Sequence, residues 1–505
     1  MQGNNSVTHS HNFLTYQGEG RELPLGLNFI RIPTNFLFMF GLPPHVLLLL
    51  FICLAAACAF EFVNGFHDTA NAVATVIYTN TLQPWVAVVW SAFWNFIGVF
   101  AGGIGVAMGI IYLLPVETLV DQNVYHGIAM VGALILSAII WNVGTWYYGI
   151  PASSSHALIG SILGVGIAYS LLPESHGSAV NWGKAGETGI ALLVGPLLGF
   201  ALTIGMMFIF KRLAPSKAIF KEPHKRKPPP MWIRLLLIVT CTLVSFFHGS
   251  NDGQKGVGLV MLILIGIVPS YFALDQSKNP LDMRTSLTKV EYVIGRVNRA
   301  ELSVANQKLL ADVQVQSADL HRIFAGATRV EDLPQATRFE IRRDALLLAN
   351  RTKKLLGANE LSLSTTDRKT YDDAVKDMKS FTDYAPWWVL LMVSLSLACG
   401  TMIGWQRIVK TIGERIGKEH LTYAQGASSE LVAAAMIGAS TAFGLPSSTT
   451  HVLTSSVAGS MVASRGVKNI NPGVVRTIVL AWVLTLPVTM VLSGLLFILF
   501  RSLLS

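Results

Sequence analysis

Two stretches of this 505-residue chain decide its fold: Gly65-Phe-His-Asp-Thr-Ala-Asn71 and Gly249-Ser-Asn-Asp-Gly-Gln-Lys255. Each places polar and ionisable residues inside a long apolar run, 44–80 in the first case and 235–271 in the second. A membrane-spanning helix requires about 20 mostly apolar residues, so both runs are too long for one simple span. We expect two spanning helices, each broken at its polar stretch.

A second pair of polar stretches bends two further apolar runs. Pro151-Ala-Ser-Ser-Ser-His156 interrupts the run 127–170, and Pro446-Ser-Ser-Thr-Thr-His451 interrupts 428–463. Asp68 precedes His156 by 88 residues; Asp252 precedes His451 by 199, and leaving out the 111 residues of 273–383 makes that spacing 88 as well. Two motifs in the same order at matching spacing indicate an internal repeat.

The composition excludes a large soluble core. Hydrophobic residues make up 52% of the chain and charged residues 13%, with a mean hydropathy of +0.50, whereas soluble domains carry roughly 25% charged residues. Further apolar runs at 86–113, 189–210, 386–404 and 474–500 complete the picture of a polytopic membrane protein. The net charge of +9 lies in short loops between these runs, so it does not indicate a nucleic-acid surface.

Loop charges predict the orientation of the chain. Eight Lys and Arg residues stand against one Glu in 211–234, and 405–420 and 464–476 are also basic, whereas 114–126 and 171–188 are acidic or balanced. Basic loops face the cytoplasm. If each broken run crosses once and each Ser-rich run forms a hairpin, every loop falls on the expected side, and the two halves have opposite orientations. The fold expected is an all-α inverted-topology repeat with two Ser/Thr-rich helical hairpins.

The same reasoning divides the chain into segments. We expect a polar N-terminal segment without a signal peptide, two membrane repeats separated by a basic cytoplasmic loop, and a soluble, helical, periplasmic insertion inside repeat two. The boundaries are 1–43 for the N-terminal segment, 44–211 for repeat one, 212–234 for the basic loop, 235–272 for the start of repeat two, 273–384 for the insertion and 385–505 for the rest of repeat two.

The polar breaks hold ionisable residues at membrane depth, where each costs about 2.5–3.5 kcal/mol to insert. A carboxylate beside the carbonyls of a broken helix suits a cation or a proton, and Asp68 and Asp252 repeat in equivalent breaks. Contacts between helices also explain a lone ionisable residue, so that alternative stays open for the others. The candidates for cation or proton coupling are Asp68, Asn71, His67, Asn251, Asp252, Lys255 and Glu430, with Glu61, His156, His451 and Gln254 in supporting positions.

The Ser- and Thr-rich stretches suit an oxyanion. Each begins with a proline, which favours the first turn of a helix, and hydroxyls with free backbone N–H groups at a helix start bind anions. A lone Pro-Ser-Ser stretch is most simply a helix cap, but two matching copies favour one anion site built from both. Its predicted residues are Ser153, Ser154, Ser155, Ser447, Ser448, Thr449 and Thr450.

The sequence gives no sign of an enzyme or of an ATP-driven pump. It has no Gly-x-x-x-x-Gly-Lys-Ser/Thr loop, the motif that cradles nucleotide phosphates, and no nucleophile with a credible base partner. No catalytic residues, resident cofactor or resident metal site are predicted. Composition and spacing alone therefore indicate a two-fold repeated anion carrier.

The four polar stretches resemble the paired signatures of the inorganic phosphate transporter (PiT) family. The resemblance covers nearly all of 44–271 and 385–500 and is closest to the bacterial low-affinity Pit phosphate symporters, which also carry a hydrophilic insertion here. It implies phosphate import across the bacterial inner membrane by proton symport. It also implies that phosphate can travel as a neutral complex with a divalent metal, which would then be cargo.

Two departures from the family pattern bear on the coupling ion. Sodium-coupled relatives typically have Gly-x-Asn-Asp-x-x-Asn in both repeats, whereas here His67 replaces the first Asn of repeat one and Lys255 the last Asn of repeat two. Asn95 also stands where those relatives tend to carry a glutamate, while Glu430 is kept. A lysine ammonium can occupy the place of a bound cation, and histidine is a natural proton carrier near neutral pH. The hypothesis is therefore coupling to protons.

Three alternatives remain beside a proton–phosphate symporter. One is coupling to sodium, and another is a different oxyanion such as sulfate. The third is a membrane receptor or scaffold acting through 273–383, which leaves the repeated polar turns without a purpose. The partners expected are phosphate, protons and the lipid bilayer, with no nucleic acid, and a homodimer stays open.

Overall fold

The computed structural model describes residues 42–114, 124–173, 175, 180–214, 216–224, 227–357, 363–411, 416–418 and 420–504. The chain divides into residues 1–44 and residues 45–505, and the description below concerns the second unit. Nearly all of the predicted N-terminal segment 1–43 lies outside the described residues.

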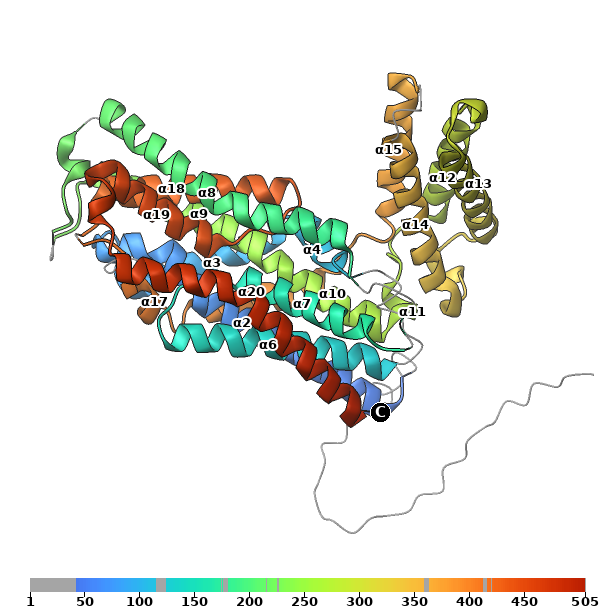
Figure 1. The fold of residues 1–505 in the computed structure, drawn as a ribbon, viewed down its shortest axis with the longest axis horizontal. Coiled ribbons are helices and arrows are strands. Elements are labelled where there is room, and N and C mark those ends of the chain that lie inside the picture. Colours follow the sequence, from blue (N-terminus) through green and yellow to red (C-terminus); the bar gives the residue numbers. More distant parts are fainter. Residues whose placement is uncertain are drawn as a thin grey trace, which may run out of the picture. The chain divides into compact units, whose positions relative to one another are not determined.

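Every regular element among the described residues is a helix (Figure 1). Six helical segments within them are long and apolar enough to cross a membrane, which confirms the expected all-α polytopic class. The first half contains α2 (Pro44–Tyr78), α3 (Pro84–Ala101), α4 (Gly105–Ile111), α6 (Val124–Tyr147), α7 (Ser154–Ser170) and α8 (Trp182–Leu213). The second contains α9 (Met231–His248), α10 (Gln254–Ile267), α11 (Pro269–Phe272), α16 (Trp387–Thr401), α17 (Gln406–Lys410), α18 (Tyr423–Ala442), α19 (Thr449–Arg465) and α20 (Pro472–Leu504).

The expected breaks in the two long helices are wrong. Helix α2 runs without interruption from Pro44 to Tyr78, through the polar stretch 65–71. In the second half, α9 continues through a π-helical turn, Gly249–Gly253, into α10. The helices remain wound because the polar side chains of these stretches find partners on neighbouring helices. The π turn is a local bulge of the kind often found at functional sites.

The two predicted hairpins are present. Helices α6 and α7 pack against each other, as do α18 and α19. Each connecting turn contains a glycine with positive φ, Gly149 at +66° and Gly444 at +65°, a conformation that glycine adopts without steric cost. The prolines were expected in the first helical turn, but Pro151 and Pro446 lie two residues before the N-caps of α7 and α19. Their fixed φ stiffens the non-helical approach to each cap.

Each hairpin packs against the last long helix of the other half. Helix α20 lies along α7 and α6, while α8 lies along α19 and α18 (Figure 1). Glycines permit this close approach: a Cβ at Gly164 of α7 would lie 2.0 Å from the carbonyl oxygen of Met490, and one at Gly459 of α19 would lie 2.4 Å from that of Phe200. Such small-residue contacts are the usual basis of tight helix packing in membranes. The two halves are therefore interlocked by matching contacts.

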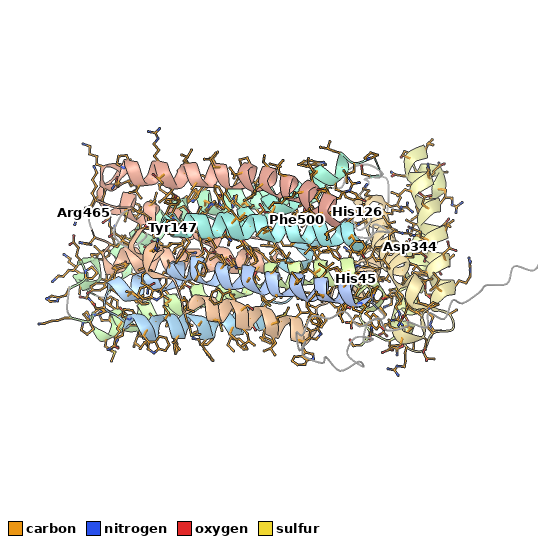
Figure 2. All side chains as sticks on the ribbon, turned by 90° about the horizontal axis from the view of Figure 1, so that it is seen from below. His45, His126, Tyr147, Asp344, Arg465 and Phe500 are labelled. Carbon is orange, nitrogen blue, oxygen red and sulfur yellow. The ribbon has the colours of Figure 1, made fainter. Side chains whose placement is uncertain are left out.

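The loops group at the two ends as their charges predicted. Glu222 of loop 211–234 pairs with Arg465 of loop 464–476 at 3.7 Å, and the backbone of Lys418 bonds to that of Asn469 at 2.8 Å. At the other end, the Asn181 backbone N–H donates to the carbonyl oxygen of Leu113 at 2.9 Å. Figure 2 shows Arg465 at one end of the molecule and His45, His126 and Phe500 toward the other. Which compartment each end faces stays a prediction.

The insertion is helical, as expected. Its helices are α12 (Pro280–Gly295), α13 (Val304–Phe324), α14 (Arg338–Gly357) and α15 (Thr365–Lys379), which pack on one another. The buried guanidinium of Arg342 donates to the carbonyl oxygens of Ala273 at 3.0 Å and Thr382 at 2.6 Å. This arginine therefore ties together the two chain segments by which the insertion joins the membrane helices.

Candidate functional site

The N-termini of α7 and α19 meet in the interior of the protein. Ser153 caps α7 by accepting a hydrogen bond from the His156 backbone N–H at 3.1 Å. Ser448 caps α19 in the same way, by accepting from the His451 backbone N–H at 3.2 Å. The rings of these two histidines lie 4.4 Å apart between centroids. All the predicted anion-binding residues are buried here: Ser153, Ser154, Ser155, Ser447, Ser448, Thr449 and Thr450. Two positive helix ends thus converge, which is an arrangement suited to an anion.

Asp68 of α2 joins the two hairpins. Ser154 Oγ of α7 donates to Asp68 Oδ2 at 2.8 Å, and Thr450 Oγ1 of α19 donates to Asp68 Oδ1 at 2.8 Å. His67 Nδ1 lies 2.8 Å from the same Oδ1 atom. Repeat one therefore supplies a buried carboxylate that contacts hydroxyls from both halves of the chain.

Asp252, in the π turn, is paired with the ammonium group of Lys255 at 2.8 Å. Lys255 Nζ also donates to Ser155 Oγ of α7 and, at 2.7 Å, to the carbonyl oxygen of Ser447 before α19. Thr449 Oγ1 lies 3.4 Å from Asp252 Oδ2. A buried cation with three acceptors thus connects the second carboxylate to both hairpins.

The contacts of the two halves correspond position by position. Asp68 and Asp252 each accept from the first helical residue of the hairpin in their own half, Ser154 or Thr449. Asn71 Nδ2 donates to Thr450 Oγ1 of the other half at 3.0 Å, as Lys255 does to Ser155. The equivalent positions 71 and 255 therefore both donate to the hairpin of the other half, one through an amide and the other through an ammonium group.

Asn251 and Gln254 stabilise the surroundings of the site and do not line its centre. Asn251 Oδ1 accepts from the Ser447 backbone N–H at 3.0 Å, and its Nδ2 donates to Thr441 Oγ1 at 3.0 Å. Gln254 Oε1 accepts from the Val106 backbone N–H at 2.9 Å at the start of α4. The Asn251 amide therefore stabilises the turn of the second hairpin, and the Gln254 amide stabilises the start of α4.

Two predicted carboxyl groups have no hydrogen bond or ion pair to Asp68, Asp252 or Lys255 among the described residues. Glu61 accepts from Asn64 of the same helix at 3.4 Å, and Glu430 of α18 accepts from Thr240 of α9 at 2.5 Å. In both, the second carboxyl oxygen is buried without a hydrogen-bond partner among the described residues. The contacts of Glu430 do not join it to Asp68 or Asp252, so its role in coupling stays a prediction.

His248 is a site residue that the sequence reasoning did not select. It lies one turn before Asp252, and its Nε2 atom is 3.7 Å from Asp252 Oδ2 and 4.0 Å from Asp68 Oδ2. One ligand atom from each of these three residues lies within 4.8 Å of the others, so they could hold a metal ion. The signal was present as the spacing His248-x-x-x-Asp252, which puts both side chains on one helix face.

The fold and the site define a polytopic membrane carrier whose buried centre suits a small anion. The chain belongs to the phosphate transporter family, whose sequence profile matches residues 64–493. It is 40% identical over 492 residues to the low-affinity inorganic phosphate transporter PitB of Escherichia coli (strain K12), covering 90% of this chain and 97% of that one. It is 38% identical over 489 residues to PitA of the same strain, again covering 90% and 97%.

A solved structure described as the sodium-dependent phosphate transporter has the same fold. It aligns with a TM-score of 0.52 and 19% identity, covering 90% of this chain and 99% of that one. The expected family is therefore confirmed, and since its members are named as transporters, so is the expectation that the chain is not an enzyme. The protein is a multi-pass phosphate transporter.

Proposed function

We propose that this phosphate transporter works by proton symport and imports phosphate, as a neutral complex with a divalent metal, across the bacterial inner membrane. The observation that favours protons over sodium is the position of Lys255 Nζ, which lies 2.8 Å from Asp252 and is bonded to both hairpins. This tethered ammonium takes the place beside Asp252 Oδ1 that a sodium ion bound to that oxygen would need. His67, bonded to Asp68, is the candidate proton carrier, with Asp68 and Asp252.

The charge of the site supports transport of a neutral complex together with a proton. With neutral histidines, the buried groups Asp68, Asp252 and Lys255 leave one net negative charge. A metal–phosphate complex without net charge leaves that balance unchanged, and one added proton brings it to zero. Because unpaired charge is costly in a low-dielectric interior, a loaded site without net charge is the easiest to close off from water on both sides.

The matching contacts of the two halves support an inverted repeat with alternating access. Each hairpin is held by the last long helix of the other half, and the hairpin tips meet at the Asp68 and Asp252 carboxylates. Inverted repeats place substrate between the halves and open it to each side by rocking one bundle against the other. The contacts of Asp68 and Lys255 with both hairpins are then the ones that rearrange in each cycle.

Phosphate uptake into proteoliposomes tests the proposal. Uptake is measured with an imposed pH gradient, with an imposed sodium gradient, and with or without a divalent metal. Accumulation should follow the pH gradient, ignore sodium and require the metal. Uptake that follows only sodium would overturn proton coupling and favour the sodium alternative. Competition by sulfate as strong as that by unlabelled phosphate would favour a general oxyanion carrier.

A further inference from the structure

The imidazole of His248 points a free nitrogen at two carboxylates. The side chain is buried at 2% exposure, and its Nε2 has no hydrogen-bond partner among the described residues. That atom faces Asp252 Oδ2 at 3.7 Å and Asp68 Oδ2 at 4.0 Å. Both distances exceed the length of a hydrogen bond, so Nε2 is hydrogen-bonded to neither carboxylate.

The contact of the other ring nitrogen identifies the tautomer of a neutral His248 ring. Thr401 Oγ1 donates its hydrogen to the Leu397 carbonyl at 2.9 Å, so it can only accept from Asn95 Nδ2 at 3.0 Å. This orients the Asn95 amide with its oxygen toward His248 Nδ1, 3.0 Å away. An amide oxygen accepts, so Nδ1 carries the hydrogen and, in the neutral ring, Nε2 presents a lone pair.

The two carboxylates each have an acceptor position left. Oδ1 of Asp68 is occupied by His67 and Thr450, and Oδ1 of Asp252 by Lys255. Each Oδ2 accepts from a single hydroxyl, and a carboxylate oxygen has about two lone-pair positions. In the neutral ring, the histidine nitrogen and the two Oδ2 atoms are therefore three electron-pair donors, with no hydrogen between Nε2 and the carboxylates.

The spacing of the three atoms suits a metal ion. Nε2 lies 3.7 Å and 4.0 Å from the two Oδ2 atoms, and one ligand atom from each of the three residues lies within 4.8 Å of the others. A point equidistant from three atoms at such separations lies about 2.0–2.5 Å from each, which spans the lengths of bonds from divalent cations to carboxylate oxygen and imidazole nitrogen. Asn95 orients the ring through its other nitrogen, as the hydrogen-bond partners of metal-binding histidines do. Coordination by a cation relieves the repulsion among the three donors.

We propose that Asp68 Oδ2, Asp252 Oδ2 and His248 Nε2 bind the divalent cation of the transported metal phosphate. The identity of the cargo in this assignment rests on the proposed function, whereas the position of the site rests on geometry. Ser154 and Thr449, which donate to the same two Oδ2 atoms, are the first residues of α7 and α19. Each of these hydroxyls donates its single hydrogen to a carboxylate, so a phosphate at the same helix ends would bind the backbone N–H groups there, and one substrate complex spans both parts.

The donor set also predicts which cations bind most tightly. One imidazole nitrogen with two carboxylates suits first-row transition cations such as Mn²⁺ and Zn²⁺, whereas Mg²⁺ prefers an all-oxygen shell. Mn²⁺ is the more informative probe because its electron spin reports a directly bound nitrogen nucleus. We expect purified full-length protein without phosphate to bind Mn²⁺ with such a nitrogen coupling in pulsed electron paramagnetic resonance, and excess Zn²⁺ to displace it at lower concentration than Mg²⁺.

Variants separate this site from other histidines and from adventitious surface binding. His248→Gln should remove the nitrogen coupling and weaken Mn²⁺ binding. Asn95→Leu should keep the coupling and weaken binding by about 10- to 100-fold, the usual effect of removing the partner of a metal-bound histidine. His156→Gln is the matched control, because its buried ring lies 4.4 Å from that of His451 and its Nδ1 lies 2.8 Å from Ser153 Oγ; it should retain the coupling.

The outcomes distinguish the site from the proposed function. Bound Mn²⁺ without nitrogen coupling, or coupling that persists in His248→Gln, overturns the assignment of His248. If the variant does not fold, absence of nitrogen coupling in the wild-type protein still refutes it. If His248 is refuted in this way but phosphate uptake still depends on the metal, the proposed function is retained and the metal binds elsewhere. Coupling as expected with metal-independent uptake would instead keep the site and refute metal phosphate as the cargo.

Discussion

Replacing Lys255 with methionine leaves the Asp252 carboxylate buried without its cation. In the native protein the ammonium lies 2.8 Å from Asp252 Oδ1, both side chains are almost completely buried, and the same ammonium bonds to both hairpins. Removing one partner of a buried ion pair costs about 3–5 kcal/mol, because the other charge stays in a low-dielectric environment. We expect Lys255→Met to lower the free energy of unfolding by that amount.

A double-mutant cycle isolates the pair. Asp252→Asn should cost less than Lys255→Met, because the remaining ammonium keeps Ser155 Oγ and the Ser447 carbonyl as acceptors. The double variant contains neither charge, so its cost should fall short of the sum of the single costs by about 0.5–3 kcal/mol. Residues in contact typically show such a coupling energy.

The assay is denaturant unfolding of the full-length protein in mixed detergent micelles. Arg296→Met is the matched control, because Arg296 pairs with Asp367 at 2.9 Å in the insertion but is 55% exposed. Exposed pairs contribute about 0–1 kcal/mol. A Lys255→Met variant as stable as this control would refute the reasoning, since it would mean that Asp252 does not depend on Lys255 for its charge balance.

Four further substitutions have definite expected outcomes. Asp68→Asn and Asp252→Asn should each abolish phosphate uptake in proteoliposomes while gel filtration still shows folded protein; residual uptake near the wild-type rate would contradict this. Gly164→Leu forces α7 away from the α20 backbone and should lower the thermal unfolding midpoint, whereas the same change at Gly186, which has open space around it, should not. In the insertion, hydrogen bonds from Thr328 and the Arg329 backbone hold the pKa of Asp332 below its ordinary value. This carboxylate therefore stabilises the fold at pH values above its unfolded pKa, and the stabilisation is lost as the pH falls through its folded pKa. Asp332→Asn should flatten that part of the pH–stability profile.

The sequence was most informative where a pattern occurred twice. The matched spacing of the polar stretches predicted two equivalent halves, and Asp68 and Asp252 each accept a hydrogen bond from the first helical residue of the hairpin in their own half, Ser154 or Thr449. Loop charge predicted which loops share an end. Both kinds of inference rest on regularities that extend over the whole chain, so a local irregularity does not mislead them.

Inference failed where the outcome depends on a partner far away in the sequence. The polar run 65–71 indicated a break in α2, but Asp68 and Asn71 find partners on the hairpins and the helix stays intact. His248 looked like one more polar residue because its orientation is set by Asn95 on α3. Gln254 carries a motif position yet caps α4. Such roles depend on which helices become neighbours, and one sequence does not contain that information.

The central claim is that one phosphate binds between the two hairpins. Structure determination of the protein with phosphate bound tests it most directly. We predict tetrahedral density between the N-termini of α7 and α19, within hydrogen-bond distance of hydroxyls from both, including Ser154 or Ser155 and Thr449 or Thr450. Phosphate density that contacts a single hairpin, or that lies away from Asp68 and Asp252, would contradict the account.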